Sequence, residues 1–157
     1  MNFSKITDNL YIGTTPKAKD YELLHKLGVE LVINIRFGFP PARDPISPPM
    51  KSLWLPVIDS PFFPIPIRLL QVGAIEALKV IDQGGVVYAH CSRGRHRGPV
   101  MGACILIAQG MSPEEAMRLI EQQRPVADPH AWYIQRRIMK FARVWAKTRL
   151  EEPTHHY

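Results

Sequence analysis

The chain has 157 residues, of which 46% are hydrophobic, so it is long enough for one domain that buries its own core without disulfides or a structural metal. Its two cysteines form no spaced framework, and no apolar run is typical of a signal peptide or a membrane span, so we expect a cytoplasmic protein. The formal net charge of +6 favours an anionic partner, but no zinc-knuckle, RNA-recognition or helix-turn-helix pattern accompanies it, and we expect a monomer that binds no nucleic acid.

In the first half of the chain, apolar runs alternate with a helical pattern and with a proline-rich loop. Strands are predicted over residues 10–13, 29–36 and 52–57. A helical pattern over residues 17–27 ends at Gly28, which suits the left-handed conformation that closes many helices. The third strand is expected near a sheet edge, because Pro56 has no N–H to donate.

The second half continues the alternation. After a loop stiffened by three prolines, the patterns predict a helix over residues 67–82, a strand over 86–90, and helices over 98–109, from Ser112 onward and over 130–147. Residues 1–149 are expected to form a single domain, and residues 150–157 a flexible tail. The whole pattern predicts an α/β fold, with a central, mostly parallel, twisted sheet of about four to five strands flanked by helices.

One segment, which begins at the end of the predicted strand 86–90, points to chemistry. It reads His90-Cys91-Ser92-Arg93-Gly94-Arg95-His96-Arg97. Ligands bind beyond the carboxyl ends of parallel strands, where Cys91 is expected, and Gly94 allows a tightly curled backbone after it. Such a loop points its N–H groups inward as an anion-binding nest, and the next helix adds the positive end of its dipole. The segment therefore predicts a phosphate pocket that holds Cys91 as a thiolate.

The chemistry also needs a proton donor, because the oxygen that leaves a phosphate ester must be neutralised. Asp59 is the candidate, since it follows the apolar run 53–58 and is expected near a strand end. The alternative is that Asp59 only caps a turn through Ser60 and Pro61, which is common for an Asp before such a pair. Without further information, the sequence favours the interpretation of Asp59 as a turn cap over that of a proton donor.

Over nearly its whole length the chain resembles the dual-specificity protein tyrosine phosphatases, a family of cysteine-dependent phosphatases. The resemblance is carried by the HCxxGxxR pattern of residues 90–97, and by Asn9-Leu10-Tyr11-Ile12-Gly13, Leu27-Gly28-Val29 and Arg124-Pro125. In the family the acid lies about thirty residues before the cysteine, and Asp59 precedes Cys91 by 32 residues, which favours the acid role. The string from Cys91 to Arg97 also resembles that of plant and fungal atypical phosphatases that act on inositol pyrophosphates.

The resemblance implies a cysteinyl-phosphate mechanism that uses no cofactor and no metal. Cys91 would attack phosphorus while the amides of residues 92–97 and the guanidinium of Arg97 bind the phosphate oxygens. Asp59 would protonate the leaving oxygen and then, as a carboxylate, activate the water that hydrolyses the intermediate. His90 would support the thiolate from the strand side without touching the substrate.

The expected substrate is a phosphorylated protein that carries phosphotyrosine, or also phosphoserine or phosphothreonine. The alternative is a phosphorylated small molecule, either an inositol phosphate, an inositol pyrophosphate or a phosphoinositide. Arg93, Arg95 and His96 can contact extra phosphates or acidic residues around a target tyrosine, or they can simply raise the local positive potential.

One residue departs from the family pattern, because Gly98 stands where the family has Ser or Thr. In the family that hydroxyl is thought to help the thiolate leave in the second step. Either hydrolysis of the intermediate is then slow, or another donor such as Ser92 replaces the missing hydroxyl. We expect a phosphoenzyme that accumulates, and a phosphate-binding module without turnover remains a third alternative.

Three further observations have competing explanations. Phe62 and Phe63 can flank an aromatic substrate ring, although aromatic residues beside prolines more often anchor packing. Cys104 can pair with Cys91 in a disulfide, but a buried core thiol is favoured. Asp128 is expected to cap the last helix rather than to support the site.

Overall fold

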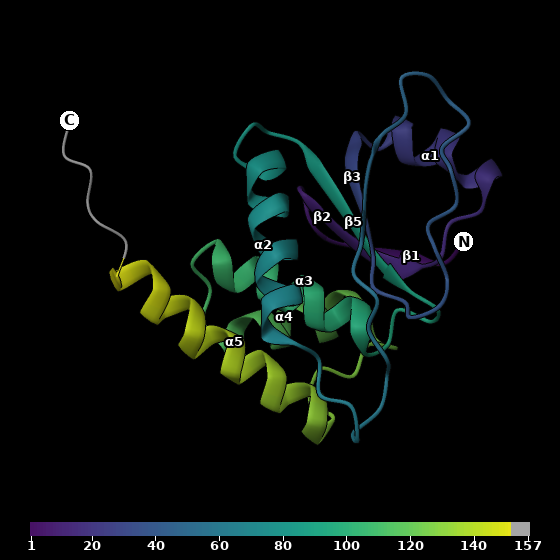
Figure 1. The fold of residues 1–157 in the computed structure, drawn as a ribbon. Coiled ribbons are helices and arrows are strands. Elements are labelled where there is room, and N and C mark those ends of the chain that lie inside the picture. Colours follow the sequence, from purple (N-terminus) through teal and green to yellow (C-terminus); the bar gives the residue numbers. More distant parts are fainter. Residues whose placement is uncertain (152–157) are drawn as a thin grey trace, which may run out of the picture.

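The computed structural model describes residues 1–151, which form a five-stranded sheet with helices on both faces (Figure 1). The strands are β1 (Phe3–Thr7), β2 (Leu10–Thr14), β3 (Val29–Asn34), β4 (Lys51–Trp54) and β5 (Val86–Cys91). The helices are the 3₁₀ turn η1 (Ala18–Asp20), α1 (Tyr21–Lys26), α2 (Ile67–Ile81), α3 (Arg97–Ala108), α4 (Pro113–Gln123) and α5 (Trp132–Glu151). In this described part of the chain, no helix is both long and apolar enough to cross a membrane.

The sheet has the strand order β1-β2-β5-β3-β4, with β5 at its centre. The pairs β2–β5, β5–β3 and β3–β4 are parallel, whereas β1 pairs antiparallel with β2. The prediction of an α/β fold with a mostly parallel sheet is therefore confirmed. Because β5 is covered on both faces, it is apolar almost without interruption up to His90 and Cys91.

Each face of the sheet has its own apolar core. On one face, α1 packs on a small cluster that includes Tyr21, Leu24 and Tyr88. On the other face, α2 to α5 enclose the main core, and α3 lies at its centre with every residue from Gly98 to Ala108 buried. Figure 1 shows α1 and the group α2 to α5 on opposite sides of the sheet. Because α3 is buried all around, the loop that precedes it rests on a rigid support.

The register of the sheet brings the strand ends together at one edge. Thr14 of β2 lies opposite Cys91, and Asn34 of β3 lies opposite His90. Beyond β4 the chain remains extended and bonded to its neighbour, since Leu55 donates to the Asn34 carbonyl and Phe37 donates to the Val57 carbonyl. The sheet therefore delivers the segment that contains Asp59 to the same edge as Cys91.

The predicted elements differ from the observed ones mainly at their ends. The sequence patterns do not predict β1, because only Ile6 of its five residues is buried and the apolar alternation is too weak. The helix predicted over residues 17–27 is divided into η1 and α1, and the strand predicted over 52–57 ends at Trp54, before Pro56. Helix α5 includes Leu150 and Glu151, where the predicted tail begins; the rest of that tail, residues 152–157, lies outside the described residues.

Candidate active site

The segment after β5 curls around the sulfur of Cys91. The Sγ atom of Cys91 accepts hydrogen bonds from the amides of Gly94, at 3.2 Å, and Gly98, at 3.3 Å. Gly94 has φ +63°, a conformation that a residue with a side chain rarely adopts. Two backbone donors and the N-terminus of α3 thus surround a buried sulfur, an arrangement that stabilises negative charge on it.

Arg124 holds the outer side of this loop, a role that the sequence patterns did not indicate. Its Nε donates to the Gly94 carbonyl at 2.8 Å, its Nη2 to the Arg93 carbonyl at 3.0 Å and its Nη1 to Ser4 Oγ at 3.0 Å. Arg124 is only 2% exposed, so these three acceptors replace the water that its guanidinium loses on burial. With carbonyls turned outward to Arg124, the loop is free to turn its amides inward.

Arg97, the first residue of α3, connects the loop to the segment before Asp59. Its Nη1 donates to the Val57 carbonyl at 2.9 Å. Its Nε is buried and has no hydrogen-bond partner among the described residues. A buried donor without an acceptor costs free energy, so an oxyanion seated in the loop would satisfy this atom.

Asp59 lies beside the loop and is held by two side chains. Its Oδ2 lies 3.0 Å from His96 Nδ1, and its Oδ1 accepts a hydrogen bond from Tyr133 Oη at 2.9 Å. The Tyr133 oxygen also lies 3.3 Å from His96 Nδ1. Burial, followed by the hydrogen bond to Asp59, raises the pKa of Tyr133 to about 12, so the hydroxyl remains a donor at neutral pH. The sequence patterns gave no signal for Tyr133, because it comes from α5.

The structure brings the predicted site residues, except Gly94 and His90, to one cavity at this edge of the sheet. The residues that line it are Asp59, Cys91, Ser92, Arg93, Arg95, His96 and Arg97. Arg93 and Arg95 are exposed at its rim. Among residues 1–151, no group of three or more His, Cys, Asp or Glu side chains is placed to hold a metal ion.

Asp128 lies beside the loop that follows Cys91 and does not cap a helix. Its carboxylate lies 4.0 Å from Arg95 Nη2 and 4.0 Å from His96 Nε2, and its amide donates to the Arg95 carbonyl at 2.9 Å. Helix α5 begins only at Trp132, so the prediction that Asp128 caps this helix is wrong. Asp128 instead ties the loop to the turn that precedes α5.

His90 lies behind the loop and is 1% exposed. Burial, with a smaller contribution from the positive charge of Arg36, lowers the pKa of His90 to about 3. The imidazole is therefore neutral at physiological pH, and its Nδ1 has no hydrogen-bond partner among the described residues. His90 carries no charge that could pair with the sulfur of Cys91.

Gly98 occupies the position at which the dual-specificity phosphatases, which the chain resembles, have the hydroxyl of Ser or Thr. A Cβ built on Gly98 would lie 3.6 Å from Cys91 Sγ and 3.3 Å from Ile12 Cγ2. A hydroxyl on that carbon would thus lie near the sulfur, which supports the expectation that its absence matters for the second step.

Two of the remaining alternatives are decided by burial. Cys91 and Cys104 are both free, and Cys104 is fully buried in α3, where burial raises the pKa of its thiol well above the usual value. The interpretation of Cys104 as a core thiol is confirmed. Phe62 and Phe63 are 87% and 60% exposed, so the interpretation as packing anchors is wrong, and both rings remain available to a substrate.

Comparisons with known proteins were made for both the sequence and the structure. No protein-family model matches the chain. The sequence is 30% identical to mouse dual specificity phosphatase 28 over 129 residues, which cover 82% of this chain and 77% of that protein. It is 29% identical to the protein-tyrosine-phosphatase MKP1 of Arabidopsis thaliana over 129 residues, 81% of this chain but only 16% of that longer protein.

Solved structures share the fold. Human DUSP28 matches with a TM-score of 0.80 at 23% identity, over 92% of this chain and 95% of that one. PTPMT1 in complex with PI(5)P matches with a TM-score of 0.78 at 23% identity, over 94% of this chain and 98% of that one. Since the similarity in sequence to dual specificity phosphatase 28 extends over most of both chains, the protein belongs to the dual specificity phosphatases, a family of cysteine-dependent phosphatases.

Proposed function

We propose that this phosphatase hydrolyses phosphotyrosine in proteins, and also phosphoserine or phosphothreonine, through a cysteinyl-phosphate intermediate. One observation supports this more than any other: the cavity that contains Cys91 also contains Asp59 and Arg97, although these residues come from separate segments of the chain. A nucleophile, an acid and an anion-binding guanidinium in one cavity are the groups that phosphoryl transfer requires.

In the first step, Cys91 Sγ attacks phosphorus and forms the S–P bond while the P–O bond to the tyrosine breaks. The leaving oxygen takes the proton of Asp59. The loop amides and Arg97 bind the three non-bridging oxygens, including a hydrogen bond from the Arg97 Nε that has no partner among the described residues. The two amides that donate to Sγ stabilise the thiolate before the attack.

In the second step, the Asp59 carboxylate removes a proton from water, the water oxygen attacks phosphorus, and the S–P bond breaks to release inorganic phosphate. Tyr133 donates to Oδ1 of Asp59, and His96 Nδ1 lies 3.0 Å from Oδ2, so both side chains keep the carboxylate in place while it exchanges the proton. His90 supports the strand end from behind. Because Gly98 offers no hydroxyl to the departing thiolate, we expect this step to be slow enough for the intermediate to accumulate.

The binding residues of the proposal belong to the loop that curls around the sulfur. They are Ser92, Arg93, Gly94, Arg95, His96 and Arg97, of which all but Gly94 line the cavity; Gly94 contributes its amide and Arg97 its guanidinium. We infer further a single catalytic domain over residues 1–149, a monomer, a cytoplasmic location and no nucleic acid partner. The two free cysteines support a reducing compartment, since the nucleophile must stay unoxidised.

The test is turnover of an aryl phosphate and of phosphotyrosine, phosphoserine and phosphothreonine peptides in the presence of a chelator. We expect Cys91→Ser to abolish phosphate release and Asp59→Asn to reduce it by about a hundredfold or more. Activity that survives in Cys91→Ser, or that disappears with the chelator in the wild type, would contradict the mechanism.

A second candidate function is hydrolysis of an inositol phosphate or a phosphoinositide at the same site. The observation that favours it is the exposure of Arg93 and Arg95 at the rim of the cavity, where they can meet additional phosphates. Comparing the same peptides with inositol polyphosphates at matched concentrations distinguishes the two. A higher kcat/KM for the inositol substrates would favour the second candidate.

A further inference from the structure

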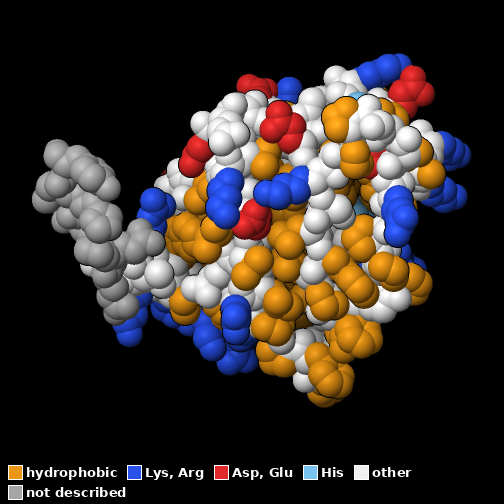
Figure 2. All heavy atoms as spheres, turned by 45° about the horizontal axis from the view of Figure 1, so that its top comes forward, with side chains coloured by type: hydrophobic (Ala, Val, Ile, Leu, Met, Phe, Trp, Pro, Cys, Tyr) orange, Lys and Arg blue, Asp and Glu red, His pale blue; other side chains and the backbone are white. Residues whose placement is uncertain are grey.

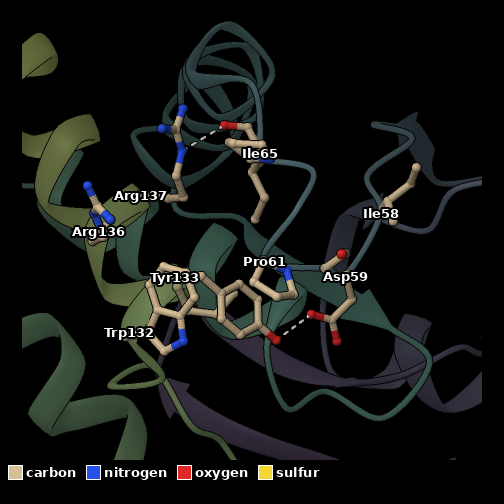
Figure 3. A pocket seen from close by; sticks show the side chains of 11 residues that line it. Ile58, Asp59, Pro61, Ile65, Trp132, Tyr133, Arg136 and Arg137 are labelled. Carbon is tan, nitrogen blue, oxygen red and sulfur yellow. Dashed lines mark hydrogen bonds between the residues drawn. The ribbon is translucent and has the colours of Figure 1, made fainter.

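A second cavity, drawn in Figure 3, adjoins the phosphate cavity, since Asp59 lines both. It lies between the segment that follows β4 and the first turns of α5. Its walls are formed by Ile58, Asp59, Ser60, Pro61, Pro64, Ile65, Trp132, Tyr133, Ile134, Arg136 and Arg137. Only Asp59 and Tyr133, which holds the Asp59 carboxylate, have a role in the reaction proposed above, so the other residues of this cavity have no assigned function.

The position of Asp59 determines which part of a substrate reaches this cavity. A general acid must contact the oxygen that leaves, so the group attached to that oxygen begins beside Asp59. Tyr133 fixes the Asp59 carboxylate from the side of α5, through the hydrogen bond drawn in Figure 3. The tyrosine ring of a substrate and the residues next to it in sequence are thus placed where the second cavity opens.

The charges in this cavity favour a negative group. Arg136 and Arg137 are neighbours on α5, and burial, followed by the charge of Arg136, lowers the pKa of Arg137. Arg137 uses its Nε to hold the Ile65 carbonyl at 3.0 Å. Within residues 1–151, neither guanidinium has a carboxylate within ion-pair distance, although several other basic side chains do. Their mutual repulsion is uncompensated, and an anion bound at Arg136 would relieve it.

The rest of the cavity is mostly apolar and is open to solvent. Pro61 is exposed, and Trp132 is 62% exposed, although large aromatic side chains are usually buried. In Figure 2, apolar side chains gather over the lower part of the visible face, with Lys and Arg side chains at their border. An apolar wall that ends at a guanidinium fits a side chain with a methylene arm and a carboxylate, as in glutamate.

We propose that this second cavity selects phosphotyrosine substrates with an acidic side chain close to the phosphotyrosine, and that Arg136 binds that carboxylate. The proposal rests on the proposed function, because it assumes that a peptide occupies the phosphate cavity. Arg136 is then a specificity-determining residue for the same reaction. Arg137 positions the segment around Ile65 through its hydrogen bond.

The experiment compares three phosphotyrosine peptides of one length that carry Glu, Gln or Lys on both sides of the phosphotyrosine, at constant ionic strength. For the wild type we expect kcat/KM to be about three- to tenfold higher for the Glu peptide than for the Gln peptide, and lower still for the Lys peptide. In Arg136→Ala, the ratio between the Glu and Gln peptides falls toward one. In Arg136→Glu, the preference reverses toward the Lys peptide.

Lys140→Ala is the matched control, because Lys140 is an exposed cation one turn further along α5 that does not line the cavity. Removing it changes the net charge by the same amount, and we expect the Glu-to-Gln ratio to stay at its wild-type value. An equal kcat/KM for the Glu and Gln peptides in the wild type would overturn the proposal. So would an equal fall of the ratio in Arg136→Ala and Lys140→Ala, which would indicate a general effect of net charge.

If the proposed function itself is wrong, the same assays give results that differ from those that would overturn only the role of Arg136. If the wild type hydrolyses p-nitrophenyl phosphate but none of the three peptides, the substrate is not a phosphotyrosine protein. If Arg136→Ala reduces turnover of an inositol polyphosphate and leaves the Glu-to-Gln ratio unchanged, the cavity binds a second phosphate of a small molecule, and the acidic peptide is excluded.

Discussion

Tyr133→Phe is the perturbation that tests the geometry of the acid most directly. It removes one oxygen atom, and with it the hydrogen bonds to Asp59 Oδ1 at 2.9 Å and toward His96 at 3.3 Å. A hydrogen bond to a charged group contributes about 1.5–3 kcal/mol. Because His96 still holds Oδ2 at 3.0 Å, we expect the lower part of this range, which corresponds to a loss of about tenfold in rate.

The loss should depend on the leaving group, because only a poor leaving group needs the proton of Asp59 in the transition state. We expect kcat/KM to fall about tenfold for phenyl phosphate and by less than about twofold for an aryl phosphate with a strongly acidic phenol. The parameter to measure is kcat/KM, since it reports the steps up to phosphoryl transfer and is not affected by slow hydrolysis of the intermediate.

The double variant with Asp59→Asn provides the control. If Tyr133 acts by positioning Asp59, Tyr133→Phe has no further effect once the acid is absent. An equal loss for all leaving groups, or a full additional loss in the Asp59→Asn background, would show that Tyr133 acts in some other way.

Three further predictions concern the loop and its support. Gly98→Ser places a hydroxyl near Cys91 Sγ and should speed hydrolysis of the intermediate by about tenfold, which is the effect of one hydrogen bond; a rapid-quench burst as large as that of the wild type would contradict this. Arg124→Met leaves the carbonyls of Gly94 and its neighbour without a donor and should lower the free energy of unfolding by about 2–4 kcal/mol; an unchanged urea midpoint would refute this account of the loop. His90 has its pKa lowered from 6.5 to about 3, so below pH 6.5 the unfolded chain binds a proton that the folded chain does not, and stability falls as the pH falls. Between pH 6.5 and pH 5 this amounts to about 2 kcal/mol in urea unfolding, and His90→Asn should remove that part of the pH dependence, whereas an equally steep dependence in the variant would exclude His90 as its cause.

The elements that depend on local pattern could be predicted from the sequence. The apolar runs that become β2, β3 and β5 indicated the parallel sheet, and the serine before α4 marked the start of that helix, where Ser112 accepts a hydrogen bond from the Glu115 amide. The loop that begins at Cys91 could also be predicted, because a nucleophile, a glycine and an arginine occur within seven consecutive residues. Strand β1 could not be predicted, because its stability comes from pairing with β2 and not from its own apolar pattern.

Short runs of neighbouring residues were enough to predict the α/β class and to propose Cys91 as the nucleophile and Arg97 as the anion-binding guanidinium. The partners that come from distant segments became visible only in the folded chain. Arg124 follows the loop it supports by thirty positions, and Tyr133 lies 74 positions after Asp59. A sequence pattern reports periodicity and short spacing, whereas these contacts depend on how α4 and α5 pack across the main core, and only the folded chain brings their side chains to the edge of the sheet.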